Sequence, residues 1–253
     1  NVNTTRTIQQ LEYRSIIGMI KRAQVYFLNN IMTVSGVCTI YNIKDVQSVG
    51  GFRSDVAAED IQLSWDLEKA NKRLTYVPNA ILYMNSPVSI YGLLKQRKRW
   101  SLGGMQTLTS FRSLLFEKGH NAQKFFLIES AISVVWVFCF FLVSIIIGLK
   151  LIFSYPSPLD LNDVIPPTAI LFSSSTLLMV FAYKFEYGLK ESKTTFIKNF
   201  WVYPVVYWLV MPFSYILGFK DFIFKNKLFF LWILETNEYP VRLLTYCKRS
   251  ESI

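Results

Sequence analysis

Gln96, Arg99 and Trp100 together supply the side chains that can bind a sugar diphosphate. In a helix, their i, i+3, i+4 spacing places an amide, a guanidinium and an indole on one face. Arginine forms paired hydrogen bonds with phosphate oxygens, and an indole ring can stack on a sugar. A second interpretation stays open, because the run KQRKRW (95–100) is also typical of a basic amphipathic helix at a membrane surface.

A helix over residues 87–102 is the element predicted to carry this face. Ser86 can cap its start, and Pro87 suits the first helical position because its missing N–H would lack a partner there. Gly103 and Gly104 are typical of a helix end.

An acidic pair, Glu59 and Asp60, opens the second candidate element, a helix that runs to about Arg73. One interpretation is structural, because carboxylates at a helix start bind free N–H groups and suit the helix dipole. The other is catalytic, because the same field keeps a carboxylate ionised as a general base. The residues alone leave both open.

The rest of the first 112 residues predicts an α/β domain. Residues 1–30 carry apolar side chains at roughly helical spacing. The run from Ile31 to Tyr41 predicts a buried strand, and Ser35-Gly36 within it indicates a close backbone approach. Residues 75–78 and 80–84 predict two short strand pieces, and the break between them falls at Pro78.

From residue 125 onward the chain predicts membrane-spanning helices. Apolar runs without charge at 130–149, 165–183 and 201–219 indicate spans at about 127–150, 165–183 and 201–219, each long enough to cross a bilayer. The loop 154–164 lacks basic residues and should lie outside, whereas basic loops at 97–124 and 184–198 should be cytoplasmic. Three spans place the C-terminus outside, but its basic residues favour the inside, and the apolar segment 222–234 could dip into the membrane.

Composition narrows the class of protein. The chain has 253 residues, is 52% hydrophobic and 16% aromatic, and carries a formal net charge of +10. The basic residues are spread among apolar spans, which favours anionic lipid or an anionic substrate over nucleic acid. Cys38, Cys139 and Cys247 match no metal-binding spacing.

Read in order, AEDIQLSWDL (58–67), YVPNA (76–80) and KQRKRW (95–100) resemble the processive, membrane-embedded family 2 glycosyltransferases. Their E-D and Q-x-x-R-W motifs stand in the family's order, about 35 residues apart, with transmembrane runs behind them. Further stretches (10–24, 33–41, 99–104 and 201–209) are similar to the bacterial poly-β-1,6-N-acetylglucosamine synthases of biofilm exopolysaccharide.

The resemblance assigns a role to each candidate residue. Asp60 becomes the catalytic base of an inverting transfer from UDP-N-acetylglucosamine to the growing polymer, with Glu59 in support. Gln96 and Arg99 hold the diphosphate and offset the charge of the leaving UDP, and Trp100 stacks on the acceptor sugar. Ser35 and Gly36 bring backbone close to the acceptor end.

One family feature is missing: the chain contains no D-x-D motif, which in this family binds a divalent metal. We therefore expect the C-terminal portion of a synthase, inactive alone, with Mg²⁺ or Mn²⁺ held by residues outside this chain. Its expected partners are the UDP-sugar donor, the polysaccharide acceptor, the lipid bilayer, the missing N-terminal half and a small accessory membrane subunit. Nucleic acid is not among them.

The expected organisation is the C-terminal half of a GT-A domain (1–112) with an interfacial helix, a linker (113–124) and a membrane region (125–253). It implies a multi-pass plasma-membrane protein with a cytoplasmic catalytic part that passes the polymer across the membrane. Alternatives are a portion of a chitin, hyaluronan or cellulose-type synthase, an inactive remnant, or a non-enzymatic membrane subunit.

Overall fold

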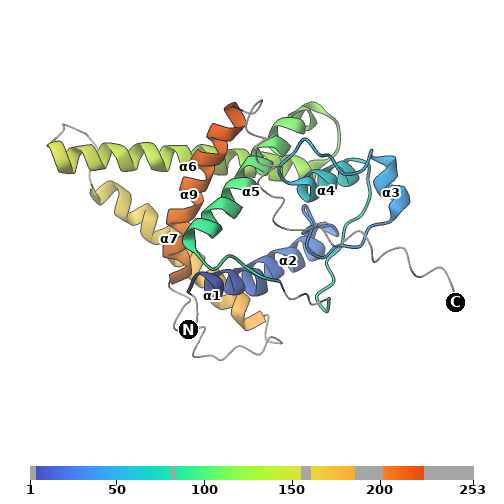
Figure 1. Ribbon diagram of the computed structural model, residues 1–253, viewed down its shortest axis with the longest axis horizontal. Coiled ribbons are helices and arrows are strands. Elements are labelled where there is room, and N and C mark those ends of the chain that lie inside the picture. Colours follow the sequence, from blue (N-terminus) through green and yellow to red (C-terminus); the bar gives the residue numbers. More distant parts are fainter. Residues whose placement is uncertain (1–3, 81, 83, 155–160, 186–201, 225–253) are drawn as a thin grey trace.

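The computed structural model describes residues 4–80, 82, 84–154, 161–185 and 202–224, and all regular structure in these ranges is helical (Figure 1). The first seven described helices are α1 (Thr4–Leu11), the π-helix η1 (Glu12–Ile17), α2 (Gly18–Leu28), α3 (Ile43–Ser48), α4 (Glu59–Lys69), α5 (Ile90–Ser110) and the 3-10 helix η2 (Arg112–Phe116). The long apolar helices are α6 (Asn121–Phe153), α7 (Leu161–Phe185) and α9 (Val202–Ile223).

The predicted strands at 31–41, 75–78 and 80–84 are wrong for the residues that the structure describes, because none of them is a strand there. A strand exists only when its backbone bonds to a neighbouring strand. Here the backbone N–H groups of Ile31 and Leu74 donate to the side chain of Asn30, at 3.0 and 2.8 Å. Side chains thus replace the expected sheet partners. The α/β expectation is not confirmed in the described part.

The predicted helix start at Glu59 or Asp60 is confirmed by α4, but the helix that carries the basic motif differs from its prediction. Helix α5 is capped by Ser89, whose Oγ accepts from the backbone N–H of Gly92 at 3.1 Å. It runs through Gly103 and Gly104, so the predicted stop there is wrong. Gly103 has a packing role in the helix interior, described below.

Two apolar clusters fix α4 in place. One joins Leu63 and Leu67 of α4 to Ile31, Val46 and Leu74, and it holds α3 and two loop segments against the helix. The other joins Trp65 on a different face of α4 to Phe111, Leu114 and Leu127, which lie in or beside η2 and α6. Helix α4 is therefore the centre of the part that precedes α6.

Two of the described helices are long and apolar enough to cross a membrane: Asn121–Phe153, and Tyr203–Ile223 within α9. The 33 residues of α6 give it a length of about 50 Å. The continuous apolar part of α7, Ile165–Phe181, has 17 residues and is shorter than an ordinary span. The predicted span at 165–183 is therefore not established, and neither is the total of three spans. Within the predicted membrane dip at 222–234, residues 222 and 223 are the last of α9 and residue 224 lies in the turn after it. Residues 225–234 lie outside the described residues.

Helix α9 lies alongside α5 (Figure 1). Their backbones approach closely at Gly218, where an added Cβ would lie 3.2 Å from the carbonyl oxygen of Lys98 and from the backbone nitrogen of Leu102. An ion pair of 2.6 Å between Lys98 and Asp221 closes the same contact. The helix that carries the basic motif thus rests on α9.

Replacing Gly218 with valine should separate α5 from α9, because the atoms that the new side chain meets belong largely to the rigid backbone of α5. We expect a loss of about 1–3 kcal/mol in the free energy of unfolding, measured by denaturant titration in detergent. Gly148→Val in α6 is the matched control, since nothing lies within 4 Å of its added Cβ. Equal effects of the two substitutions would contradict this packing.

Candidate active site

Asp60 lies in the first turn of α4, at the positive end of the helix dipole. The N-cap residue, Ala58, has no side-chain oxygen to cap the helix. Asp60 Oδ1 accepts the backbone N–H of Ile61 at 2.9 Å, and Oδ2 accepts the N–H of Gly36 at 2.7 Å. The carboxylate therefore serves in part as a cap, as the structural interpretation predicts, and in part as the anchor of a distant loop.

The predicted residues Ser35 and Gly36 lie directly against this carboxylate. An added Cβ at Gly36 would stand 3.0 Å from Asp60 Oδ2, so the approach leaves little room for a side chain. Ser35 and Gly36 are exposed, Asp60 is half-buried and Glu59 is exposed. The carboxylate therefore lies close to solvent on the side of Ser35 and Gly36.

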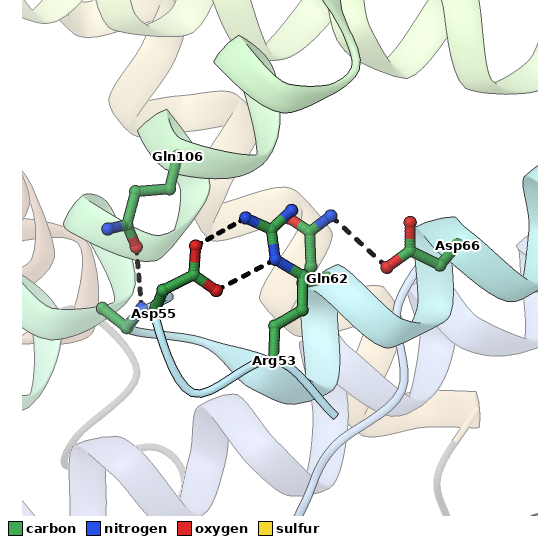
Figure 2. A network of polar contacts seen from close by, with 6 residues as sticks. Arg53, Asp55, Gln62, Asp66 and Gln106 are labelled. Atoms are coloured by element: carbon green, nitrogen blue, oxygen red, sulfur yellow. Dashed lines mark hydrogen bonds and ion pairs between the residues drawn. The ribbon is translucent and has the colours of Figure 1, made fainter. Parts of the chain in front are cut away.

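The segment before α4 is gripped by side chains of α5. Arg99 Nη1 donates to the carbonyl oxygen of Ala57 at 3.2 Å, and Gln106 Oε1 accepts the N–H of Ala57 at 2.7 Å. Figure 2 shows Gln106 reaching down to this segment from α5. An added Cβ at Gly103 would overlap the Cβ of Ala58 and lie 3.0 Å from its backbone nitrogen. The basic motif and the acidic motif are thus held as one unit.

The loop just before this segment and helix α4 itself carry further polar contacts (Figure 2). Arg53 pairs with Asp55 through two hydrogen bonds of 3.0 and 2.6 Å, and Gln62 Nε2 donates to Asp66 Oδ2 at 3.4 Å. The Arg53–Asp55 pair is exposed, so it contributes little to stability.

Trp100 is held from two sides by residues that the sequence did not single out. The guanidinium carbon of Arg97 lies 4.2 Å from the centre of the Trp100 ring, and the ring of Tyr13 meets it edge-on at 6.2 Å. Arg97 forms a buried ion pair with Glu12 of η1, with hydrogen bonds of 3.0 and 2.5 Å. Burial raises the pKa of Tyr13 to about 12, so its phenol is neutral.

Gln96 lies one turn before Trp100 on α5. Its carbonyl oxygen Oε1 is buried and has no hydrogen-bond partner among the described residues. An unpartnered buried acceptor is costly, so it points to a group that a ligand or water completes. The structure therefore joins Asp60 to Ser35 and Gly36, links Arg99 to the segment just before Asp60, and places Gln96 and Trp100 on the same helix as Arg99.

A divalent metal does not fit the residues that the structure describes. Among them, no three Asp, Glu, His or Cys side chains gather where they could hold an ion. Glu59 and Asp60 supply two carboxylates without a third ligand. The groups that the described residues do bring to the site are an acid, an amide and a guanidinium, from Asp60, Gln96 and Arg99.

Glu12, Tyr13, Arg97, Ala57 and Gln106 support the site but were not predicted from the sequence. Arg97 and Glu12 stand 85 positions apart, and an ion pair across that distance leaves no local pattern. The one available signal was a charged residue, Glu12, within an otherwise apolar helical spacing. A buried charge needs a partner, but the sequence does not say which one.

A cavity of about 350 Å³ lies at the other end of α4 and is lined by Glu68, Asn71, Gln123 and neighbouring polar residues. Burial raises the pKa of Glu68 to about 7, while a hydrogen bond of 3.0 Å from Asn30 opposes the rise. The carboxyl group is therefore easily protonated, eight positions along α4 from Asp60.

Comparisons with known proteins identify relatives over most of the chain. The model of the family described as "Glycosyl transferase family group 2" matches residues 1–234. A poly-beta-1,6-N-acetyl-D-glucosamine synthase of Staphylococcus epidermidis is 31% identical over 229 residues, covering 87% of this chain and 54% of the relative. A synthase of the same name from Staphylococcus aureus (strain COL) is 38% identical over 132 residues, 52% of this chain and 32% of the relative.

The chain thus spans about half the length of the Staphylococcus epidermidis relatives that it matches. No solved structure matches it significantly.

Replacing Gly103 with alanine should push α5 away from Ala58, because the added Cβ overlaps that residue. We expect a loss of about 1–3 kcal/mol in the free energy of unfolding. The adjacent Gly104→Ala is the control: nothing lies within 4 Å of its Cβ, so the change should be neutral or stabilising by up to about 1 kcal/mol. A Gly103→Ala protein as stable as Gly104→Ala would show that α5 does not grip this segment.

Stability should fall as the pH rises towards 7, owing to Glu68. Its pKa is raised from 4.5 to about 7, so the folded protein keeps a proton that the unfolded chain releases between these values. Glu68→Gln retains an acceptor for Asn30 and removes this titration. The unfolding midpoint of the unaltered protein should therefore drop more between pH 5 and pH 8 than that of Glu68→Gln; parallel curves would refute this assignment.

Proposed function

The chain belongs to glycosyl transferase family group 2, and on that premise we propose that it carries the acceptor-activating part of an inverting glycosyltransferase that builds β-linked poly-N-acetylglucosamine from UDP-N-acetylglucosamine. The observation that carries the proposal is the position of Asp60, fixed by the N–H of Gly36 and preceded by a segment that Arg99 and Gln106 hold.

In the proposed reaction, Asp60 accepts the proton of an acceptor hydroxyl as that oxygen attacks the anomeric carbon of the donor. The new bond joins the acceptor oxygen to the sugar, and the bond from the sugar to the diphosphate oxygen breaks with its electron pair leaving on UDP. A sugar hydroxyl is a weak nucleophile, and a positioned carboxylate typically adds about 10²–10⁴-fold to the rate. The start of α4 and the Gly36 N–H orient the carboxylate that accepts this proton.

Arg99 is proposed to bind the leaving diphosphate together with Gln96. A guanidinium has five N–H donors, and only Nη1 is engaged with Ala57, so others can reach an anion. The unpartnered Oε1 of Gln96 supports a ligand on this helix face. Glu59, exposed beside Asp60, is proposed to support the base.

Trp100 is proposed to stack on the acceptor sugar. Its ring is fixed by Arg97 and Tyr13 before any sugar arrives. A preordered ring loses little conformational entropy on binding, which favours repeated binding of successive sugars. Ser35 and Gly36 are proposed to bound the acceptor end near Asp60.

N-acetylglucosamine is proposed as the sugar because the relatives bear that name. Chitin, hyaluronan and cellulose-type synthesis remain the alternatives, since the site residues act on hydroxyl and diphosphate groups common to all of them. The long apolar helices support a multi-pass protein of the plasma membrane, with its catalytic part in the cytoplasm and the polymer leaving across the bilayer.

A nucleotide- and metal-binding half is proposed as the partner of this chain, and Mg²⁺ or Mn²⁺ as its ion. The chain spans about half of the matched Staphylococcus epidermidis synthases, and its extended segments lack strand partners in the described part. Ile40, 98% exposed, and Val77, 58% exposed, present apolar side chains where such a half could pair. A small accessory membrane subunit is a further proposed partner.

Asp60→Asn should abolish synthesis in a chimera that joins this chain to the N-terminal half of the Staphylococcus epidermidis synthase. The change is nearly isosteric but removes the base, so incorporation of labelled N-acetylglucosamine should fall at least about 10²-fold. Asp66→Asn, on the same helix, is the matched control and should keep most of the activity. The chain alone should make no polymer from UDP-N-acetylglucosamine and Mg²⁺.

Unchanged synthesis by Asp60→Asn would overturn the catalytic assignment and leave Asp60 as a structural cap. Synthesis by the chain alone would overturn the need for a second half. If the unaltered chimera and its Asp66→Asn variant both fold but make no polymer, the chain is better explained as an inactive remnant or a non-enzymatic membrane subunit.

A further inference from the structure

We propose that Lys21 of α2 is a positioning residue for Asp60: it ties down the loop whose Gly36 N–H holds the carboxylate, and its positive charge acts on that carboxylate. The inference rests on the proposed function for its catalytic consequence, but its structural part stands independently. Neither the motifs nor the sequence analysis gave Lys21 a role.

Lys21 holds the loop at Thr33. Its Nζ donates to the carbonyl oxygen of Thr33 and to the hydroxyl Oγ1 of the same residue, the latter at 2.6 Å. Gln24, at i+3 on the same helix, accepts the N–H of Met32 through Oε1 at 3.3 Å. Two side chains of α2 therefore anchor two successive residues of the loop.

Helix α4 holds the next residues of the same loop. Ser64 Oγ accepts the N–H of Val34 at 3.0 Å, and Asp60 Oδ2 accepts the N–H of Gly36 at 2.7 Å. The loop has no regular secondary structure and no strand partner in the described part, so these side chains take the place of a sheet ladder. Loss of the hydrogen bonds from α2 would let the loop move and take Gly36 away from Asp60.

The charge of Lys21 also acts on Asp60. The amine is largely buried, and burial lowers its pKa to about 8, while the charge of Asp60 opposes that fall. Burying an ammonium group costs free energy unless hydrogen bonds and an opposite charge stabilise it. An ammonium group has three donors, two of which serve Thr33. The attraction is mutual, so the charge of Lys21 also acts on the carboxylate of Asp60.

A purely structural lysine is the rival interpretation, and three substitutions separate the two. Lys21→Met removes both the hydrogen bonds and the charge. Lys21→Gln keeps a donor without the charge, and Lys21→Arg keeps the charge. Arg22→Gln, at the next and exposed position of α2, is the matched control.

The first measurement reports the loop without any need for catalysis. Cys38 is exposed two residues after Gly36, and its N–H donates to the carbonyl oxygen of Ser35 at 3.2 Å. With Cys139 and Cys247 replaced by serine, a nitroxide spin label on Cys38 of this chain should become more mobile in Lys21→Met. It should stay as ordered as in the unaltered chain in Lys21→Arg and Arg22→Gln.

The second measurement is synthesis by the chimera with the Staphylococcus epidermidis half. Lys21→Met should lower kcat at least tenfold, with less than a twofold change in KM for UDP-N-acetylglucosamine, because the acceptor base is displaced while donor binding is kept. Lys21→Arg should restore most of kcat, and Lys21→Gln should restore loop order but not kcat. If Lys21→Met does not fold, Lys21→Gln tests the charge by itself.

An unchanged label in Lys21→Met, or an unchanged kcat in Lys21→Gln, would overturn the proposal. Failure of the proposed function gives a different result: Asp60→Asn would then remain active, while the spin label would still report whether Lys21 anchors the loop.

Discussion

The structure depends on two hydrogen bonds that hold the backbone of Ala57 against side chains of α5. Both backbone groups of this buried residue are bonded to α5 side chains, its N–H to Gln106 and its carbonyl to Arg99. Buried backbone groups must be paired, so a segment without secondary structure takes its position from whatever pairs it. Because α4 begins two residues later, the position of Asp60 follows from α5, and α5 in turn rests on α9.

The same principle explains the loop on the other side of Asp60. Residues 31–36 form no regular secondary structure, and the N–H groups of four of them bond to side chains of Gln24, Asn30, Ser64 and Asp60. The prediction of a strand was wrong in the described residues because the preference of β-branched residues for a strand is local, whereas a strand also needs a neighbour. A sequence pattern reports the first and not the second.

The helices, and the helices on which the motifs lie, could be predicted from the sequence. Apolar spacing and the acidic pair located α4, and the basic run lies on α5 as predicted. Contacts between distant segments were not predictable. Gly103 resembled a helix stop but lies inside α5 because Ala58 fills the space beside it. The buried pair of Glu12 and Arg97 and the alignment of α9 with α5 likewise leave no local pattern.

The most direct test is a structure of the chimeric synthase with UDP and an acceptor oligosaccharide bound. The account predicts an acceptor hydroxyl within about 2.6–3.2 Å of the Asp60 carboxylate, and the diphosphate in contact with Arg99 while α5 still holds Ala57. A structure in which acceptor and diphosphate lie away from these two side chains, or in which α5 has left Ala57, would contradict it.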